Sequence, residues 1–243
     1  MSAVKVLWLD RPEKRNALTL AAIGELRQHL EEADDDAAVS AIIVAARGTT
    51  FCAGVDVAEF TKASEEDAFR LITELRDLCA AARRSTKVVA CAIQGHCVGA
   101  AFELALACDF RIAAPDVEFS MPEVAIGIPS VIDAALLERY IGIGRAHEML
   151  LTADPMGAEE ALARGVVNKI VPADRLIAAA EELIARVTRH DPAAIRAQKE
   201  LFEEWLSMPF DEAVESSTRY LARSFASGTP QKLSAERLAK RQK

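Results

Sequence analysis

The sequence has few cysteines, few histidines and few aromatic residues. Its five cysteines, at positions 52, 79, 91, 97 and 108, include no Cys-x-x-Cys pair. An odd number of widely spaced cysteines is typical of reduced thiols in a cytoplasm and argues against a disulfide framework or structural zinc. The four histidines, at positions 29, 96, 147 and 190, are too scattered to indicate a metal site. We therefore predict a cytoplasmic protein that holds no metal.

Long apolar runs and an excess of basic residues are also missing. No apolar stretch approaches the roughly 18 residues that span a bilayer, and the N-terminus lacks the basic and apolar segments of a secretory signal. The 37 Asp and Glu residues outnumber 29 Lys and Arg residues, which gives a net charge of −8. Such a balance disfavours binding to nucleic-acid phosphates. We expect neither a membrane nor a nucleic acid as partner.

The chain has the composition and the patterning of a globular α/β protein. Of its 243 residues, 51% are hydrophobic and 27% charged, which excludes a disordered or fibrous chain. Strand-like and helix-like segments alternate. The predicted strands are residues 4–9, 41–46, 88–93, 110–113, 117–120 and 166–171. The predicted helices are residues 20–33, 65–83, 100–107 and two within 128–151, broken at Gly142 and Gly144.

The last part of the chain is helical. Three amphipathic stretches, residues 175–188, 192–206 and 211–227, follow one another without an intervening strand. We therefore predict an α/β core over residues 1–189 and a C-terminal helical appendage over residues 190–243. The basic tail at 231–243 is expected to be a frayed end or a phosphate contact.

Three loops carry candidate functional residues. The first, residues 51–56, reads Phe-Cys-Ala-Gly-Val-Asp after the strand at 41–46. Small residues let a ligand approach the main chain, and Gly54 permits backbone angles that other residues avoid, so free N–H groups here can bind an anion. A plain turn in which Asp56 caps the next helix explains the same residues.

The second loop, residues 94–103, contains Gly99, Ala100 and Ala101 at the start of a predicted helix. Unpaired N–H groups and the positive end of the helix dipole stabilise a developing oxyanion at such a place. Glu103, three residues after Ala100, lies on the same helix face. It equally fits a favourable charge at a helix start, and the spacing does not decide between the two interpretations.

The third loop, residues 119–130, places Glu123 between Pro122 and a Val-Ala-Ile run. Burial suits a lone carboxyl to donating a proton near neutral pH, whereas an exposed charge after a proline turn is the plainer alternative. Together, Glu103 and Glu123 indicate acid/base chemistry on a carbonyl compound.

These loops resemble those of the crotonase superfamily, the enoyl-CoA hydratase/isomerase family. The resemblance starts at residues 9–18, Leu-Asp-Arg-Pro-Glu-Lys-Arg-Asn-Ala-Leu, and continues through residues 165–167 to Val171-Pro172. It implies a spiral of repeated strand-strand-helix units whose C-terminal helices join subunits into homotrimers or homohexamers. It also implies an acyl-CoA thioester as substrate, with no cofactor besides the coenzyme A of that substrate.

The resemblance also assigns roles to residues of the three loops. The backbone N–H groups of Val55 and Ala100 match the family's oxyanion hole. Glu103 and Glu123 match the two glutamates of members that hydrate enoyl thioesters, and the presence of both favours hydration. Glu103 would then orient or activate water, and Glu123 would deliver a proton to the α carbon. The residues that match coenzyme A contacts are Lys14, Arg15, Ala17, Ala53, Asp56 and Val57.

The chain departs from the family pattern after Pro129. Common hydratases have a Gly-Gly-Thr segment there, whereas this chain reads Ser-Val-Ile-Asp-Ala-Ala from Ser130. Because this stretch matches the surroundings of the substrate's acyl group, Ser130 and its neighbours predict an atypical acyl group. Residues 232–234, Lys-Leu-Ser, also replace a frequent glutamate and glycine.

Other functions stay open alongside hydration. The alternatives are an enoyl-CoA isomerase, another crotonase-type acyl-CoA enzyme, and a non-catalytic acyl-CoA-binding partner subunit. His96 is better interpreted as a packing or orienting residue than as a base. Cys52 and Cys97 flank the site, but neither has an evident base partner.

Overall fold

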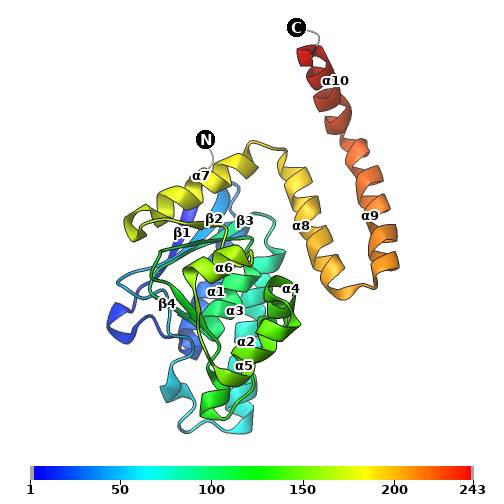
Figure 1. Cartoon of the computed structure of the whole chain (residues 1–243). Helices are drawn as coiled ribbons and strands as arrows, with labels where there is room; N and C mark the ends of the chain where they lie inside the picture. The colour runs from blue at the N-terminus through cyan, green and yellow to red at the C-terminus, as the bar shows by residue number, and fades with distance from the viewer. Residues whose placement is uncertain (1–2, 242–243) are drawn as a thin grey trace. The chain divides into compact units, whose positions relative to one another are not determined.

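The structure, a computed structural model, describes residues 3–241, and the two residues at each end lie outside this range. By backbone contacts the chain divides into two compact units, Met1–Arg189 and His190–Lys243. Figure 1 shows the strands in the first unit and a run of successive helices in the second.

Five parallel strands form the main sheet of the first unit, in the order β1-β2-β3-β5-β8. They span Ala3–Leu9 (β1), Val39–Ala46 (β2), Val88–Ile93 (β3), Phe110–Ala113 (β5) and Lys169–Ile170 (β8). Ile43 of β2 pairs with Val6 of β1 and with Ala90 of β3. All of β3 and nearly all of β2 are buried. Such continuous apolar strands are typical of a parallel sheet covered on both faces.

Helices cover both sides of this sheet. The first unit contains α1 (Leu20–Asp35), α2 (Glu65–Arg84), α3 (Ala100–Ala107), α4 (Leu137–Ile141), α5 (Ile143–Thr152), α6 (Ala158–Ala163) and α7 (Leu176–Thr188). Helix α7 packs on β2, β3 and β5, whereas α1 packs on β1, β2 and α2. Figure 1 shows α7 on one side of the strands and α1, α2 and α3 on the other. The side chains of Thr19 and Ser64 cap the N-terminal ends of α1 and α2, where they accept hydrogen bonds from the N–H groups of Ala22 and Asp67.

A second, smaller sheet lies after β3 and carries the loops with the candidate residues. It consists of β4 (His96–Val98), β6 (Glu118–Ser120) and β7 (Met156–Gly157). Strand β4 pairs in parallel with β6, which pairs antiparallel with β7. The rings of Phe102 and Phe119 lie 4.9 Å apart between their centroids and are fully buried. This contact fixes α3 against the small sheet.

Short 3₁₀ turns join the larger elements. They are η1 (Pro12–Lys14), η2 (Val57–Glu59), η3 (Glu123–Ile126), η4 (Ile132–Leu136), η5 (Ala173–Arg175) and η6 (Phe225–Ser227).

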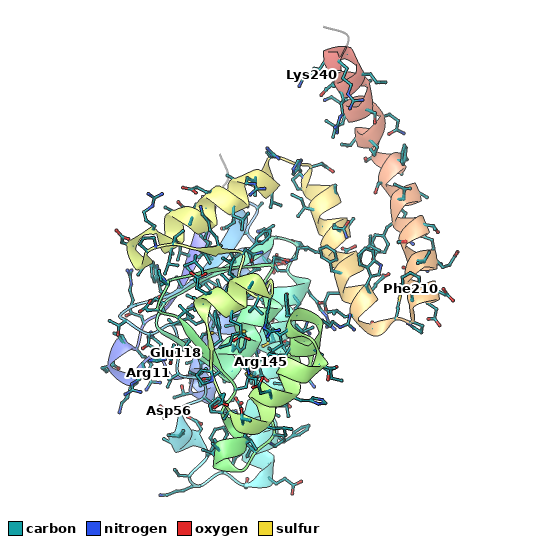
Figure 2. All side chains as sticks on the ribbon, viewed as in Figure 1. Arg11, Asp56, Glu118, Arg145, Phe210 and Lys240 are labelled. Carbon is teal, nitrogen blue, oxygen red and sulfur yellow. The ribbon has the colours of Figure 1, made fainter. Side chains whose placement is uncertain are left out.

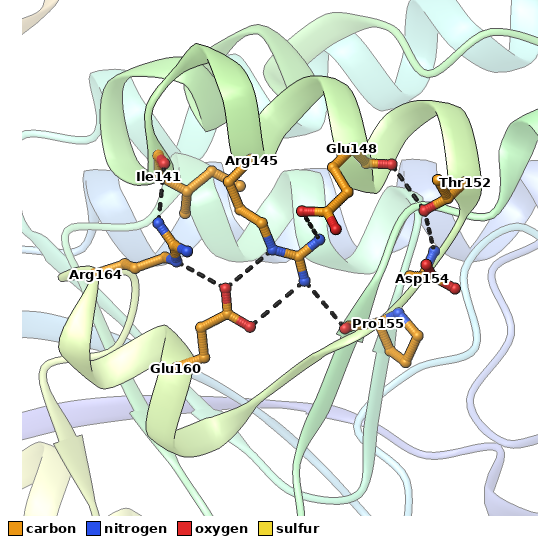
Figure 3. Close-up of polar contacts among 8 residues, drawn as sticks. All are labelled: Ile141, Arg145, Glu148, Thr152, Asp154, Pro155, Glu160 and Arg164. Carbon is orange, nitrogen blue, oxygen red and sulfur yellow. Dashed lines mark hydrogen bonds and ion pairs between the residues drawn. The ribbon is translucent and has the colours of Figure 1, made fainter.

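An ionic network connects α5 to α6 (Figure 3). Glu160 accepts hydrogen bonds from Arg145 Nε at 2.9 Å and from Arg164 Nε at 2.7 Å. Arg145 also donates to the backbone oxygen of Pro155 at 3.2 Å, which holds the segment leading into β7.

The second unit consists of α8 (Pro192–Ser207), α9 (Phe210–Ser224) and α10 (Thr229–Arg241). Helices α8 and α9 pack on each other, and Glu204 of α8 accepts hydrogen bonds from Ser216 and from Tyr220 Oη of α9, the latter at 2.9 Å. Large apolar side chains stay exposed on these helices and on η6: Phe202, Trp205, Phe210, Val214, Leu221, Phe225, Leu233 and Leu238.

Three predictions of secondary structure were wrong in detail. The helices within 128–151 break at Gly142 alone, because Gly144 lies inside the first turn of α5. Of the strand predicted at residues 166–171, only Lys169–Ile170 is a strand in the structure. The N–H groups of Val166 and Val167 instead donate to Ala161 O and close the turn after α6. Of the two expectations for the tail at 231–243, a frayed end is wrong up to Arg241, where the chain is helical in α10, and a phosphate contact stays a prediction; residues 242–243 lie outside the described range.

Two further properties concern the described residues as a whole. Between residues 3 and 241, no helix is both long enough and apolar enough to cross a bilayer. Over the same span, no three His, Cys, Asp or Glu side chains gather in a way that could hold a metal ion.

Candidate active site

The first two candidate loops lie side by side. Cys52 N–H donates to the backbone oxygen of His96 at 3.0 Å, and Val98 N–H donates to that of Cys52 at 3.1 Å. Gly54, with φ of +86°, approaches so closely that a Cβ built there would lie 2.8 Å from Val98 O and 3.9 Å from Ala100 N. A left-handed glycine at this point therefore brings the residue after it next to the start of α3.

Two main-chain donors meet where these loops touch. Leu18 N–H donates to Gly54 O and Leu18 O accepts from Asp56 N–H, both at 2.8 Å, so the groups on either side of Val55 are engaged. Ala100 is the first residue of α3, where an amide has no partner within the helix. Within residues 3–241, neither Val55 N–H nor Ala100 N–H donates to a protein acceptor. The pair can thus bind an oxygen that gains negative charge.

Glu103 projects from α3 into a buried position. Its side chain is 3% exposed, and its carboxyl accepts hydrogen bonds from the backbone N–H groups of Val131 and Ala134. Burial raises its pKa to about 8, with further contributions from the charges of Glu123 and Asp133, while the two backbone hydrogen bonds act in the opposite direction. Below about pH 8 this carboxyl therefore keeps its proton.

Glu123 begins η3 and faces the same helix start. Its side chain is half-buried, and Ser130 Oγ donates to Glu123 Oε2 at 2.8 Å. Glu123 Oε1 lies directly over Gly99, so a Cβ on that glycine would collide with the carboxyl. Gly99 precedes Ala100 and has φ of +52°. The two glutamates therefore flank the N-terminus of α3, close enough for the charge of one to raise the pKa of the other.

Gly99→Ala should damage catalysis without unfolding the protein. The new methyl group takes the space of Glu123 Oε1 and disfavours the positive φ, so both Glu123 and the Ala100 amide move. We expect kcat to fall by about 10- to 100-fold, because displacements of about 1 Å at reacting groups have such effects. Steady-state kinetics measures this. Gly24→Ala in α1, where a Cβ meets no atom within 4 Å, is the control.

The residues predicted to contact coenzyme A lie around the first loop. Ala53 N–H donates to Arg15 O at 3.0 Å, which joins the loop to the turn that carries Lys14 and Arg15, both exposed, and the half-buried Ala17. Val57 is exposed. Asp56 accepts from Ala58 N–H at 3.2 Å and lies 3.7 Å from Arg11, a pair labelled in Figure 2. Asp56 thus caps the start of η2, as the plain-turn alternative predicted.

Buried Asn16 holds this turn in place, a role that the sequence analysis missed. Its Nδ2 donates to Arg47 O at 2.9 Å and Thr50 O at 2.8 Å, and its Oδ1 accepts from Arg11 N–H at 2.8 Å. The signal was available, because Asn tolerates the left-handed conformation that it adopts here, with φ of +55°.

The cysteines and the histidine near the loops have other surroundings. Cys52 and Cys97 are fully buried, and burial raises the pKa of the Cys52 thiol to about 12 and that of Cys97 well above its ordinary value. Thiols in such a state are poor nucleophiles at neutral pH. His96 is exposed and lies 3.4 Å from Glu118. Glu103 and Glu123 therefore stay the candidate acid and base.

Comparison with known proteins identifies the family. A model of the enoyl-CoA hydratase/isomerase family matches residues 1–242. The chain belongs to this family. It is 33% identical over 221 residues to crotonyl-CoA hydratase of Syntrophomonas wolfei, covering 86% of this chain and 81% of that protein. It is 32% identical over 203 residues to 2,3-dehydroadipyl-CoA hydratase of Escherichia coli, covering 83% and 78%.

Solved structures of the enoyl-CoA hydratase/isomerase family share the fold. The structure of enoyl-CoA hydratase subunit I from Geobacillus kaustophilus superposes with a TM-score of 0.91 at 29% identity, over 99% of this chain and 93% of that one. The predicted family and the predicted fold class, an α/β crotonase-like spiral with C-terminal helices, are thereby confirmed.

Proposed function

We propose that this protein is an enoyl-CoA hydratase, which reversibly adds water to an α,β-unsaturated acyl-CoA thioester. The observation that carries the proposal is the meeting of two carboxyls, Glu103 and Glu123, with two unengaged amides, those of Val55 and Ala100, at the start of α3. The hydratases of S. wolfei and E. coli that resemble this chain support it.

In the proposed reaction the thioester oxygen accepts hydrogen bonds from Val55 N–H and Ala100 N–H. Water adds to the β carbon, and the electron pair of the double bond moves toward the thioester oxygen to give an enolate. The ionised carboxyl takes one proton from the water, and the protonated carboxyl gives its proton to the α carbon. The amides stabilise the enolate more than the neutral thioester, which lowers the barrier.

The carboxyl pair needs one proton for this cycle. At neutral pH the buried Glu103 holds that proton in the free protein, because its pKa is raised to about 8. Dehydration begins from this state, with Glu103 protonating the departing hydroxyl. Hydration begins once the proton is on Glu123 and Glu103 is ionised. Each direction ends in the state from which the other starts.

The pH dependence of kcat/KM follows from this proton. As pH rises through about 8, Glu103 loses the proton that the cycle needs, so kcat/KM should fall in both directions. Rates with crotonyl-CoA and with the corresponding 3-hydroxyacyl-CoA between pH 6 and roughly pH 10 measure this. Profiles that stay flat through the alkaline range would contradict the assignment of the shared proton to Glu103.

We further propose that the coenzyme A part of the substrate contacts Lys14, Arg15, Ala17, Ala53, Asp56 and Val57, and that no other cofactor takes part. Cations at Lys14 and Arg15 suit phosphate groups on an acidic protein. Ser130 donates a hydrogen bond to Glu123, which places the segment after Pro129 beside the reacting groups. We therefore propose that Ser130 and the residues after it contact the acyl group. To identify the acyl group, enoyl-CoA thioesters that differ in chain length and branching are screened. The loss of ultraviolet absorbance of the unsaturated thioester measures turnover.

Assembly and location are also proposals. The exposed apolar side chains of α8, α9, η6 and α10 support a homotrimer or homohexamer built through residues 190–243. Sedimentation equilibrium measures the subunit number. Five free, buried cysteines support a cytoplasmic location. Two competing functions predict other outcomes. An isomerase would move the double bond without taking up water, and a non-catalytic partner subunit would show no turnover.

A further inference from the structure

The segment Ser130–Ala134 touches both glutamates of the site. Ser130 Oγ donates to Glu123, and the amides of Val131 and Ala134 donate to Glu103. Between those amides, Ile132 has φ of +49°. A β-branched residue in the left-handed region is rare and persists only where its surroundings enforce it. Something must therefore hold this segment in place.

The anchor is an ion pair at the foot of the segment. Asp133 is 6% exposed, and both of its carboxyl oxygens accept from Arg83 Nη1, at the C-terminal end of α2. The Arg83 side chain is itself only 17% exposed. A buried ion pair is seldom the most stabilising choice at a core position, since apolar residues of similar size do as well or better. Its presence beside two carboxyls points to a role in the site.

We propose that Asp133, held by Arg83, is a positioning residue that fixes segment Ser130–Ala134 so that its amides orient the Glu103 carboxyl. This inference rests on the proposed hydratase function. It gives a role to the stretch that begins at Ser130, where common hydratases have a Gly-Gly-Thr segment.

The charges around Glu103 add an electrostatic consequence. Helix α3 packs against α2, η4 and β4. Cys79 of α2, Asp133 of η4 and Glu123 of η3 lie close enough to Glu103 to interact electrostatically with it. Arg83 of α2 pairs with Asp133, and β4 carries Cys97 and the exposed His96. The negative charge of Asp133 raises the pKa of Glu103. Removing that charge lowers this pKa, and removing the Arg83 charge raises it.

Asp133→Asn tests the proposal in the full chain. With crotonyl-CoA we expect kcat to fall by about 10- to 100-fold and KM to change by less than about threefold. The alkaline limb of kcat/KM should move down by about one pH unit. Glu74→Gln is the matched control, because Glu74 also accepts from an arginine, Arg27, across two helices of this unit. It should keep the wild-type profile.

A second readout separates this inference from the proposed function. ¹³C-carboxyl NMR of the free protein follows the titration of Glu103, assigned with Glu103→Gln, and requires no turnover. A changed chemical shift of the Glu103 carboxyl in Asp133→Asn at low pH, where the carboxyl is protonated in both proteins, supports the positioning role even if the wild type hydrates no substrate tested, because it reports the surroundings of the carboxyl. An unchanged Glu103 titration together with a kcat within threefold of the wild type overturns it.

If Asp133→Asn does not fold, Arg83→Met decides the question. That variant keeps the aspartate but removes its partner, so the Glu103 pKa should rise. Where both variants fold, a general loss of packing gives no such opposite shifts. A Glu103 titration in Arg83→Met identical to that of the wild type overturns the proposal.

Discussion

Glu103→Gln should lower kcat for hydration of crotonyl-CoA by about 10²–10⁴-fold, the contribution of a positioned acid or base. Glutamine keeps the size of the side chain and an oxygen that accepts from the amides of Val131 and Ala134. It removes the proton that the reaction needs. KM should change little, because the bulk of the substrate contacts other groups. Steady-state kinetics with wild type and variant measures both constants.

Stability data guard this experiment against a misfolded variant. The pKa of Glu103 is raised from an ordinary value of 4.5 to about 8, so between these pH values the folded state binds a proton that the unfolded state has lost. The group therefore lowers stability progressively as pH rises through that window. Glu103→Gln escapes this penalty and should melt at or above the wild-type temperature at pH 8. Glu118→Gln is the activity control, because Glu118 is an exposed glutamate on β6. This variant should keep the wild-type kcat.

Ala100→Pro should lower kcat by about 10²–10³-fold, the loss found when one oxyanion donor is removed. Proline has no N–H, and Ala100 is the first residue of α3, where proline fits a helix without breaking a hydrogen bond. The preceding Gly99 has φ of +52° and ψ of −119°, the mirror image of the extended backbone that precedes prolines elsewhere. The variant thus tests one donor with little cost to the helix.

A proline at the start of another helix is the matched control. Glu65 is exposed and begins α2, after the extended cap residue Ser64. Glu65→Pro should fold and keep nearly full activity. If Ala100→Pro retains wild-type kcat while its fold is intact, the amide of Ala100 does not stabilise the reacting oxygen.

The elements that build the site were predictable from the sequence because local patterns specify them. Apolar runs predicted β2 and β3, and the helices predicted at residues 20–33 and 65–83 correspond to α1 and α2. Strand β8 was overestimated because an apolar run does not reveal that the amides of Val166 and Val167 are used by a turn. Strand β4 was not predicted, since three residues are too short for a period to be recognised.

The candidate site residues could be selected from the sequence, and they stay a prediction, whereas their contacts could not be foreseen. The order of motifs pointed to Glu103 and Glu123. The hydrogen bonds that segment Ser130–Ala134 donates to both carboxyls depend on how the loops pack together. The burial of Asp133 against Arg83 joins residues 50 apart in the chain. No pattern along the sequence carries such a pairing, because it arises only when α2 and η4 pack.

Incorporation of ¹⁸O from labelled water into crotonyl-CoA tests the central claim most directly. If Glu103 and Glu123 add water across the double bond, mass spectrometry will show a product heavier by one water molecule, with one ¹⁸O atom at the β carbon. Glu103→Gln should slow its appearance by the same factor as kcat. A product with a displaced double bond and no ¹⁸O, formed at the wild-type rate, would contradict the account and identify an isomerase.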